Sequence, residues 1–226
     1  LSCFYSKITA VKNINFSVKR GECIAFCGLN GSGKSTLFKA LSNADDKITI
    51  SGNIFLNSKL INKLNAKQRL ENGICLVPEE RHIFKQLTVK ENLILGSYLL
   101  KDKKEINNNI ENFRKKYSAI DKYFNKKAGL LSGGEQQIIA IVRGLLSNPD
   151  ILIADEPCMG LSPYMQNEII KIIKELKTNQ KTILFSSMES NDFLNLADKI
   201  IYMKKGEIIF FGDINKYEIF KKSNAF

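Results

Sequence analysis

The chain is organised around the stretch Cys23-Ile24-Ala25-Phe26-Cys27-Gly28-Leu29-Asn30-Gly31-Ser32-Gly33-Lys34-Ser35-Thr36. Its first five residues are apolar, as in a buried strand, and the rest contains the phosphate-loop pattern G-x-x-x-x-G-K-S. Glycines in such a loop adopt backbone angles that other residues disfavour, so successive N–H groups can converge on phosphate oxygens. The helix that follows adds its positive N-terminal end. The stretch therefore predicts a strand, a polyphosphate-binding loop and a helix.

The loop also carries the groups that phosphoryl chemistry needs. Lys34 is placed to reach the β- and γ-phosphates and to take part in catalysis, and Ser35 to bind Mg²⁺. We therefore expect ATP and Mg²⁺ as cofactors. The residues predicted to bind the nucleotide here are Gly28, Leu29, Asn30, Gly31, Ser32, Gly33, Lys34, Ser35 and Thr36.

Length and composition set limits on the class of protein. The chain has 226 residues, of which 44% are hydrophobic and 25% charged, enough for one substantial core or two small ones. No apolar segment approaches the roughly 20 residues of a membrane-spanning helix. Any membrane association is therefore expected to be peripheral. We expect no signal peptide, because no charged and apolar leader precedes Leu1, and a short start of the chain to be missing.

Charge and cysteine content predict a protein with reduced cysteines and without a nucleic-acid-binding surface. The net charge of +11 is compatible with nucleic acid, an anionic membrane surface or no specific partner, and the scatter of lysines among Asn and Ile favours the last two. The five cysteines never stand in C-x-x-C spacing, which argues against metal binding and a disulfide framework. The single histidine, His82, is expected to be a loop residue.

Apolar patterns predict strands along the chain. Alternation at Ile14, Phe16 and Val18 predicts a strand within residues 8–18, and residues 48–56 predict a hairpin with a Gly-Asn turn. Short apolar runs predict further strands over 73–77, 151–154 and 182–185, and a hairpin of 200–203 with 207–211, turned at 204–206.

Helix starts are marked by capping residues. Thr88 with Glu91, and Ser132 with Glu135, have capping-box spacing, and Ser162-Pro163 places an N-cap before a proline. The helix that begins after Thr88 is expected to run to about Leu100. Apolar residues at steps of three and four predict further helical structure over 102–127. Alternating strands and helices imply a mostly parallel α/β sheet, with ligands beyond the carboxyl ends of its strands.

The strand over 151–154 ends in two carboxylates. Beside a phosphate loop, Asp155 can hold Mg²⁺ through its water shell, and Glu156 can act as the general base that polarises the attacking water. The predicted chemistry is in-line attack of water on the γ-phosphate. An Asp-Glu pair could otherwise simply cap the next helix.

The stretch Leu131-Ser132-Gly133-Gly134-Glu135-Gln136 resembles the signature of ATP-binding-cassette (ABC) ATPases, and it stands in that family's order between Lys34 and Asp155. The resemblance covers nearly the whole chain. It implies an α/β P-loop NTPase (RecA-like) fold with a mostly parallel sheet, an antiparallel β subdomain and an inserted helical subdomain at about 86–147. Residues 1–226 would then form a single nucleotide-binding domain.

The resemblance also implies partners. Two cassettes, as a homodimer or heterodimer, would pack head to tail, with each ATP between one phosphate loop and the partner's signature, where Ser132, Gly133 and Gly134 would bind the γ-phosphate. Tyr5 would stack on the base. Separate permease subunits would hold the chain at the cytoplasmic face of the cell membrane as a peripheral subunit.

Loop sequences are similar to one subfamily. They resemble the second-type ATP-binding subunits of bacterial branched-chain amino-acid importers, which implies import of branched-chain or other amino acids powered by ATP hydrolysis. The residues that carry this resemblance are Val77-Pro78-Glu79, Arg81, Phe84, Leu87-Thr88-Val89, Glu91-Asn92-Leu93, Glu135-Gln136-Gln137, Glu156-Pro157 and Gly160-Leu161-Ser162-Pro163.

Three positions depart from the general ABC pattern. Glu79, which we count among the catalytic residues, stands where most cassettes carry a Gln that senses Mg²⁺ and the attacking water, and Ser162 replaces a loop Asp. Met188 replaces the switch His. A thioether cannot donate a hydrogen bond to the γ-phosphate. We expect Glu156 to retain hydrolysis, more slowly than in cassettes with the full set.

Two alternatives remain open at this point. The chain could be a non-transport ABC ATPase acting on nucleic acid or ribosomes, although the spacing from phosphate loop to signature leaves no room for a long coiled coil. It could also be a regulatory cassette that binds ATP but barely hydrolyses it, given Met188.

Overall fold

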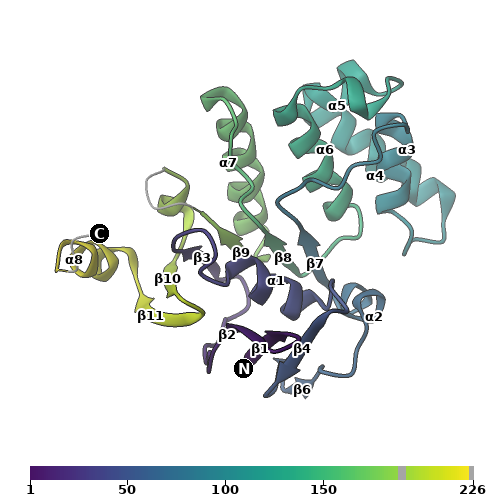
Figure 1. The fold of residues 1–226 in the computed structure, drawn as a ribbon. Coiled ribbons are helices and arrows are strands. Elements are labelled where there is room, and N and C mark those ends of the chain that lie inside the picture. Colours follow the sequence, from purple (N-terminus) through teal and green to yellow (C-terminus); the bar gives the residue numbers. More distant parts are fainter. Residues whose placement is uncertain (188–191, 224–226) are drawn as a thin grey trace.

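The computed structural model describes residues 1–187 and 192–223. Its centre is a six-stranded sheet in the order β11-β10-β3-β9-β8-β7 (Figure 1). All neighbouring pairs are parallel except β10 with β11. The strands are β3 (Cys23–Cys27), β7 (Ile74–Val77), β8 (Ile151–Ala154), β9 (Thr182–Ser186), β10 (Lys199–Lys204) and β11 (Glu207–Gly212).

Two small antiparallel sheets accompany the main one. A three-stranded sheet has the order β2-β1-β4, and β5 pairs with β6. Helix α1 contacts all three strands of the larger of these two sheets and also β7 of the main sheet. The elements are β1 (Ser2–Tyr5), β2 (Ile8–Val11), α1 (Lys34–Ser42), β4 (Ile48–Ser51), β5 (Phe55–Leu56), β6 (Lys59–Leu60) and α2 (Ala66–Glu71).

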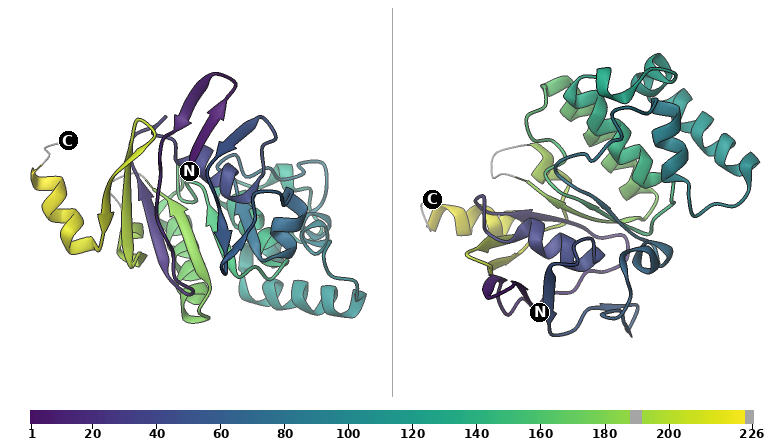
Figure 2. Two further views of the ribbon diagram at one scale, coloured as in Figure 1. Left: turned by 90° about the horizontal axis from the view of Figure 1, so that it is seen from below. Right: turned by 45° about the vertical axis from the view of Figure 1, so that its right-hand side comes forward.

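A group of helices is inserted between β7 and β8, as the resemblance implied. The right-hand view of Figure 2 shows this group (teal) on the opposite side of the main sheet from α1. It comprises α3 (Val89–Gly96), α4 (Lys103–Lys116), α5 (Ser118–Tyr123), the 3-10 turn η1 (Ala128–Leu130) and α6 (Gly133–Leu145). The remaining helices are α7 (Pro163–Thr178), η2 (Asp192–Leu196) and α8 (Ile214–Ser223).

Strand β3 supplies both hydrophobic cores. Its five residues are fully buried, and they alternate between the two faces of the sheet. Cys23, Ala25 and Cys27 pack into the core beneath the inserted helices, whereas Ile24 and Phe26 pack into the core around α1. The predicted buried strand before the phosphate loop is therefore confirmed, and the loop that follows it is anchored on both sides.

Predicted helix starts agree closely with the structure, but some helix lengths do not. Thr88 and Ser132 are N-caps with complete capping boxes, and Ser162 caps α7 with a proline in its first turn. Helix α3 ends at Gly96 and not near Leu100. A Cβ at Gly96 would lie 2.2 Å from a backbone oxygen of α6, so this end of α3 is fixed by close packing.

The predicted strand over residues 8–18 is only partly correct. Strand β2 stops at Val11, and in the described part of the chain no strand pairs with residues 15–18. The last ladder-like contact is between Leu1 and Ile14, which exchange backbone hydrogen bonds of 2.7 and 2.8 Å. Phe16 and Val18 still pack against the core around α1. The alternating pattern therefore indicated which side chains are buried, although the segment has no neighbouring strand.

The hairpin predicted over 48–56 was placed wrongly. Residues 48–51 form β4, which pairs with β1, and the hairpin is β5 with β6. Its two central residues, Asn57 and Ser58, both have positive φ, of 49° and 64°. That is the requirement of a type I′ turn, the favoured two-residue hairpin connection. Gly52 instead lets the chain leave β4, with φ of 101°.

All five cysteines are buried free thiols. Burial raises the pKa of the Cys23 and Cys158 thiols to about 12. Across residues 1–187 and 192–223, none of the helices has both the length and the apolar character that crossing a bilayer requires.

Candidate functional site

The phosphate loop joins β3 to α1, and its glycines are required by close packing. Gly28 and Gly33 have φ of 136° and 104°, in the region that glycine tolerates best. A Cβ at Gly28 would lie 2.2 Å from the backbone oxygen of Met203, and one at Gly33 would lie 2.7 Å from that of Ala10. The loop is therefore shaped by two segments that are distant in sequence.

The turn between β10 and β11 braces the loop directly. The Gly206 N–H donates a hydrogen bond to the Ser32 carbonyl at 3.0 Å, and the Lys12 N–H donates to the Gly206 carbonyl at 2.7 Å. The left-hand view of Figure 2 shows the β10–β11 hairpin running beside the strand that leads into the loop. Lys205, at the tip of this turn, is thereby brought to the mouth of the phosphate loop.

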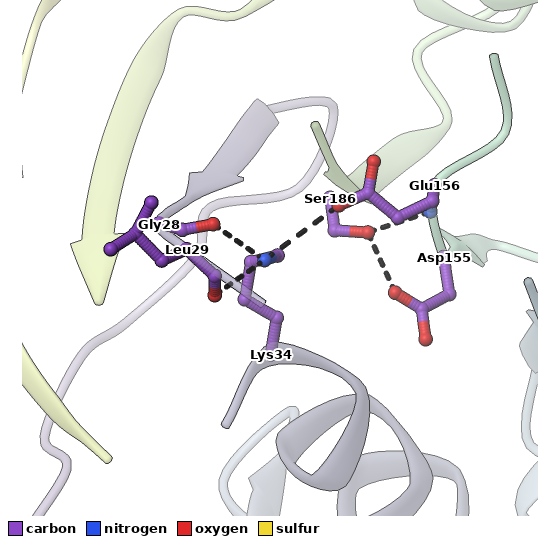
Figure 3. Close-up of polar contacts among 6 residues, drawn as sticks. All are labelled: Gly28, Leu29, Lys34, Asp155, Glu156 and Ser186. Carbon is purple, nitrogen blue, oxygen red and sulfur yellow. Dashed lines mark hydrogen bonds and ion pairs between the residues drawn. The ribbon is translucent and has the colours of Figure 1, made fainter. Parts of the chain in front are cut away.

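Lys34 is buried at the first position of α1. Its amine donates to the Gly28 carbonyl at 2.7 Å and to the Leu29 carbonyl at 3.4 Å (Figure 3). It also lies 3.7 Å from Oε1 of Glu156. The amine is therefore held inside the loop and aimed at the end of β8.

A pocket of about 560 Å³ lies over the loop. It contains predicted residues from all three sequence segments: the loop, Glu79 and Glu156. It also contains five residues that the sequence analysis did not predict: Ile8, Thr9, Ala10, Lys12 and Lys205. The only sequence signal for Lys205 was its place in the predicted 204–206 turn. The lining residues are Ile8, Thr9, Ala10, Lys12, Asn30, Gly31, Ser32, Gly33, Lys34, Ser35, Thr36, Glu79, Glu156 and Lys205.

Two polar atoms in this region are buried without a hydrogen-bond partner among the described residues: Oγ of Ser32 and Oε1 of Glu156. A buried polar atom destabilises the folded protein unless it has a hydrogen-bond partner. Burial raises the pKa of the Glu156 carboxyl, and the nearby charges of Asp155 and Glu79 raise it further, while Lys34 opposes them. The pocket thus holds a carboxyl group with a raised pKa, that of Glu156, beside the buried amine of Lys34.

Glu156 also has an unusual backbone. Its φ is 44°, in the left-handed region that costs a residue with a Cβ about 1–2 kcal/mol. Such strain persists where the surroundings fix it, commonly at functional sites. Its carbonyl accepts a hydrogen bond from the Met159 N–H at 3.1 Å, and its N–H donates to Oγ of Ser186 at 2.6 Å.

Asp155 lies behind Glu156, and its carboxylate is buried. Its Oδ1 accepts a 2.6 Å hydrogen bond from the hydroxyl of Ser186, the last residue of β9 (Figure 3). The sequence analysis did not predict a role for Ser186. The parallel register of β8 and β9, which pairs Ala154 with Phe185, is what places it beside Asp155.

The predicted signature residues lie apart from this pocket. Ser132 caps α6, and its hydroxyl accepts from the Glu135 N–H at 3.4 Å. A Cβ at Gly134 would lie 2.5 Å from Met165 of α7, and one at Gly133 would lie 3.2 Å from the guanidinium of Arg81. Packing within the chain therefore already requires a small residue at Gly134. The three residues Ser132, Gly133 and Gly134 are not in the lining of the pocket around Lys34.

A further predicted residue, Tyr5, is the register partner of Ile8, which lines the pocket. Tyr5 ends β1, and its hydroxyl donates to Oδ2 of Asp45 at 3.2 Å. Tyr5 itself is not among the residues that line the pocket. Met188 lies outside the described residues.

Comparisons with known proteins identify relatives of the chain. A family model described as "ABC transporter" matches residues 11–159. The high-affinity branched-chain amino acid transport ATP-binding protein BraG of Pseudomonas aeruginosa is 34% identical, over 92% of this chain and 88% of that protein. The probable branched-chain amino acid transport ATP-binding protein LivF of Archaeoglobus fulgidus is 31% identical, over 98% and 94%.

A solved structure resembles the fold. The ATP-binding cassette MJ0796, solved as a dimer in a post-hydrolysis state bound to ADP and Pi, superimposes with a TM-score of 0.81. The two sequences are 27% identical, and the match covers 92% of this chain and 91% of the other. The expected sheet, antiparallel subdomain and inserted helices are therefore those of a known cassette.

Proposed function

The chain belongs to the ABC transporter family as an ATPase subunit, and from this premise we propose that it powers the import of branched-chain amino acids. The observation that carries the mechanism is the placement of Lys34 between the loop carbonyls and the Glu156 carboxylate. The proposed substrate class is supported by the similarity to BraG and LivF over almost the whole chain.

We propose the following roles for the pocket. Residues 28–36 and the N-terminal end of α1 bind the phosphates, and Lys34 moves its donors from the Gly28 carbonyl to the β- and γ-phosphate oxygens. Glu156 accepts a proton from the attacking water. Glu79, which also lines the pocket, raises the pKa of Glu156 and so matches it better to this task.

The residues present fit a magnesium ion. Oxygen donors are the ligands that Mg²⁺ prefers, usually one or two protein groups together with substrate phosphates. Ser35 lines the pocket and Asp155 directly follows β8, so a hydroxyl and a carboxylate are available. When bound, Mg²⁺ would neutralise charge that develops on the phosphates.

We further propose that the nucleotide is enclosed by two cassettes. The signature start at Ser132 is the N-terminal end of α6 and lies outside the pocket of its own chain, and we propose that it faces the γ-phosphate held by a partner. Tyr5, at the end of β1, would stack its ring on the base. Permease subunits would hold the pair at the cytoplasmic face of the membrane as peripheral subunits of one complex.

The test uses the complex that the chain forms with its permease subunits, isolated from membranes and reconstituted in lipid vesicles. We expect ATP-dependent uptake of labelled leucine, and not of labelled ribose. Glu156→Gln should abolish uptake while nucleotide stays bound, and Glu80→Gln, whose side chain is 84% exposed, should leave uptake unchanged. Uptake of ribose alone would refute the substrate class. Normal turnover in Glu156→Gln would refute the base.

A further inference from the structure

The hydroxyl of Ser186 connects the two carboxylate residues at the end of β8. Ser186 is fully buried at the end of β9. Its oxygen accepts the N–H of Glu156 at 2.6 Å, and its proton is donated to Oδ1 of Asp155, also at 2.6 Å (Figure 3). One small side chain therefore contacts both residues on which metal binding and base catalysis are proposed to depend.

The direction of these bonds is determined by the number of protons. A serine hydroxyl has a single proton and can accept further hydrogen bonds on its lone pairs. Since the Glu156 N–H already donates to the oxygen, the hydroxyl proton is free to point to Asp155. The bond to a carboxylate is charge-assisted and therefore stronger than a neutral one. The chain of donors runs from the Glu156 backbone through Ser186 to Asp155.

The same hydroxyl stabilises a strained backbone. Glu156 has a φ of 44°, which is unfavourable for a residue with a Cβ. Its N–H is fixed by Ser186 and its carbonyl by the Met159 N–H. The left-handed conformation turns the chain sharply after β8, so the Glu156 side chain leaves the strand toward Lys34 while Asp155 stays behind it.

We propose that Ser186 is a positioning residue for ATP hydrolysis. It orients the Asp155 carboxylate and holds the backbone turn that directs Glu156 into the pocket, without lining that pocket itself. The inference rests on the proposed roles of Asp155 and Glu156. It differs from a merely structural role, which would predict loss of stability with catalysis and nucleotide binding reduced together.

The experiment compares three variants in the reconstituted complex. Ser186→Ala removes the hydroxyl, Ser186→Thr keeps it on a side chain that suits a strand, and Ser42→Ala removes a different buried hydroxyl. Ser42 is the control because, among the described residues, its hydroxyl donates only to the Phe38 and Lys39 carbonyls of its own helix. The measurements are kcat, the Mg²⁺ concentration for half-maximal rate, the Kd of a fluorescent ATP analogue, and the melting temperature.

We expect Ser186→Ala to lower kcat at least tenfold and to raise the Mg²⁺ requirement at least threefold. Its Kd for the ATP analogue should stay within threefold of wild type, because Lys34 and the loop are untouched. Ser186→Thr should restore kcat to within threefold, and Ser42→Ala should match wild type in all four measurements. If the extra methyl group of the Thr variant lowers the melting temperature, the proposal is judged from Ser186→Ala alone. A large fold-loss of kcat with little change in the Kd for the ATP analogue supports it.

Two results would overturn the proposal. One is a kcat in Ser186→Ala within threefold of wild type. The other is a loss of kcat matched by an equal loss of affinity for the ATP analogue. Glu156→Gln is measured in parallel: if it loses turnover while Ser186→Ala does not, only the role of Ser186 fails. If Glu156→Gln keeps turnover, the proposed base and the role of Ser186 both fail.

Discussion

The amine of Lys34 lies 3.7 Å from the Oε1 oxygen of Glu156, and both side chains are more than nine-tenths buried. The group proposed to bind phosphate and the group proposed to activate water thus neutralise part of each other's charge. A nucleotide that recruits Lys34 to its phosphates would weaken this pairing. The Glu156 carboxylate would then be available to the attacking water.

The pH dependence of turnover should reflect this environment. Burial and the charges of Asp155 and Glu79 raise the pKa of Glu156 above its ordinary value of 4.5. A general base must be deprotonated, so the rate is lost as pH falls through the raised pKa. Glu79→Gln removes one like charge and should shift the acid limb of kcat/KM to lower pH. Identical acid limbs in wild type and Glu79→Gln would contradict this, with Glu80→Gln as the control.

The glycines of the phosphate loop should differ sharply in tolerance. Gly28→Ala places a Cβ 2.2 Å from a backbone oxygen, whereas Gly31→Ala meets nothing within 4 Å, although both glycines have positive φ. Gly28→Ala should abolish binding of a fluorescent ATP analogue. Gly31→Ala carries only the backbone strain of about 1–2 kcal/mol and should still bind. Equal affinities in the two variants would show that Met203 does not constrain the loop.

Two capping residues allow catalysis to be separated from stability. Thr88 and Ser132 each cap a helix through a complete capping box. Replacing either with alanine should cost about 1 kcal/mol of unfolding free energy. Only Ser132→Ala should also lower ATP turnover, because only this hydroxyl is proposed to face the partner's nucleotide. Denaturant unfolding and turnover of the assembled complex measure the two effects, and equal turnover in both variants would exclude a role for Ser132.

Arg69 should be important for stability alone. Its guanidinium is fully buried and donates to the carbonyls of Ala40 and Leu41 at the end of α1, and to those of Ile61 and Leu64. Arg69→Met leaves these acceptors without a donor, at about 1–3 kcal/mol for each that stays buried. We expect a melting temperature lower by roughly 5–15 °C. Arg20→Met, at an exposed position, should change it little.

Patterns that act locally predicted their elements well. The capping boxes at Thr88 and Ser132 determine helix starts through contacts three residues apart, and the apolar run of β3 indicates its burial directly. The turn at Asn57 and Ser58 was missed because the Gly-Asn pair nearby is the stronger signal for a turn. Residues 15–18 alternate like a strand, but a strand also needs a neighbour, which local sequence does not indicate.

The site was predictable where a motif spans consecutive residues. Residues 28–36, Asp155 and Glu156 were predicted in this way, and the structure places most of the loop, Glu79 and Glu156 around one pocket, whereas Asp155 does not line it. The roles of these residues remain predictions. Lys205 and Ser186 were missed because each reaches the site through strand order. Lys205 follows β10, the neighbour of β3, and Ser186 ends β9, the neighbour of β8. Sheet order is a property of the whole chain.

The bracing of the phosphate loop by Gly206 has a consequence for how the protein is made. Strand β3 has β9 and β10 as its two neighbours in the main sheet, and the loop after it is bonded to a turn more than 170 residues later. During translation the amino-terminal segment leaves the ribosome long before either neighbour exists. A nascent chain that stops short of the last hairpin therefore lacks the Gly206 contact, and we expect its phosphate loop to hold ATP more weakly than that of the 226-residue chain.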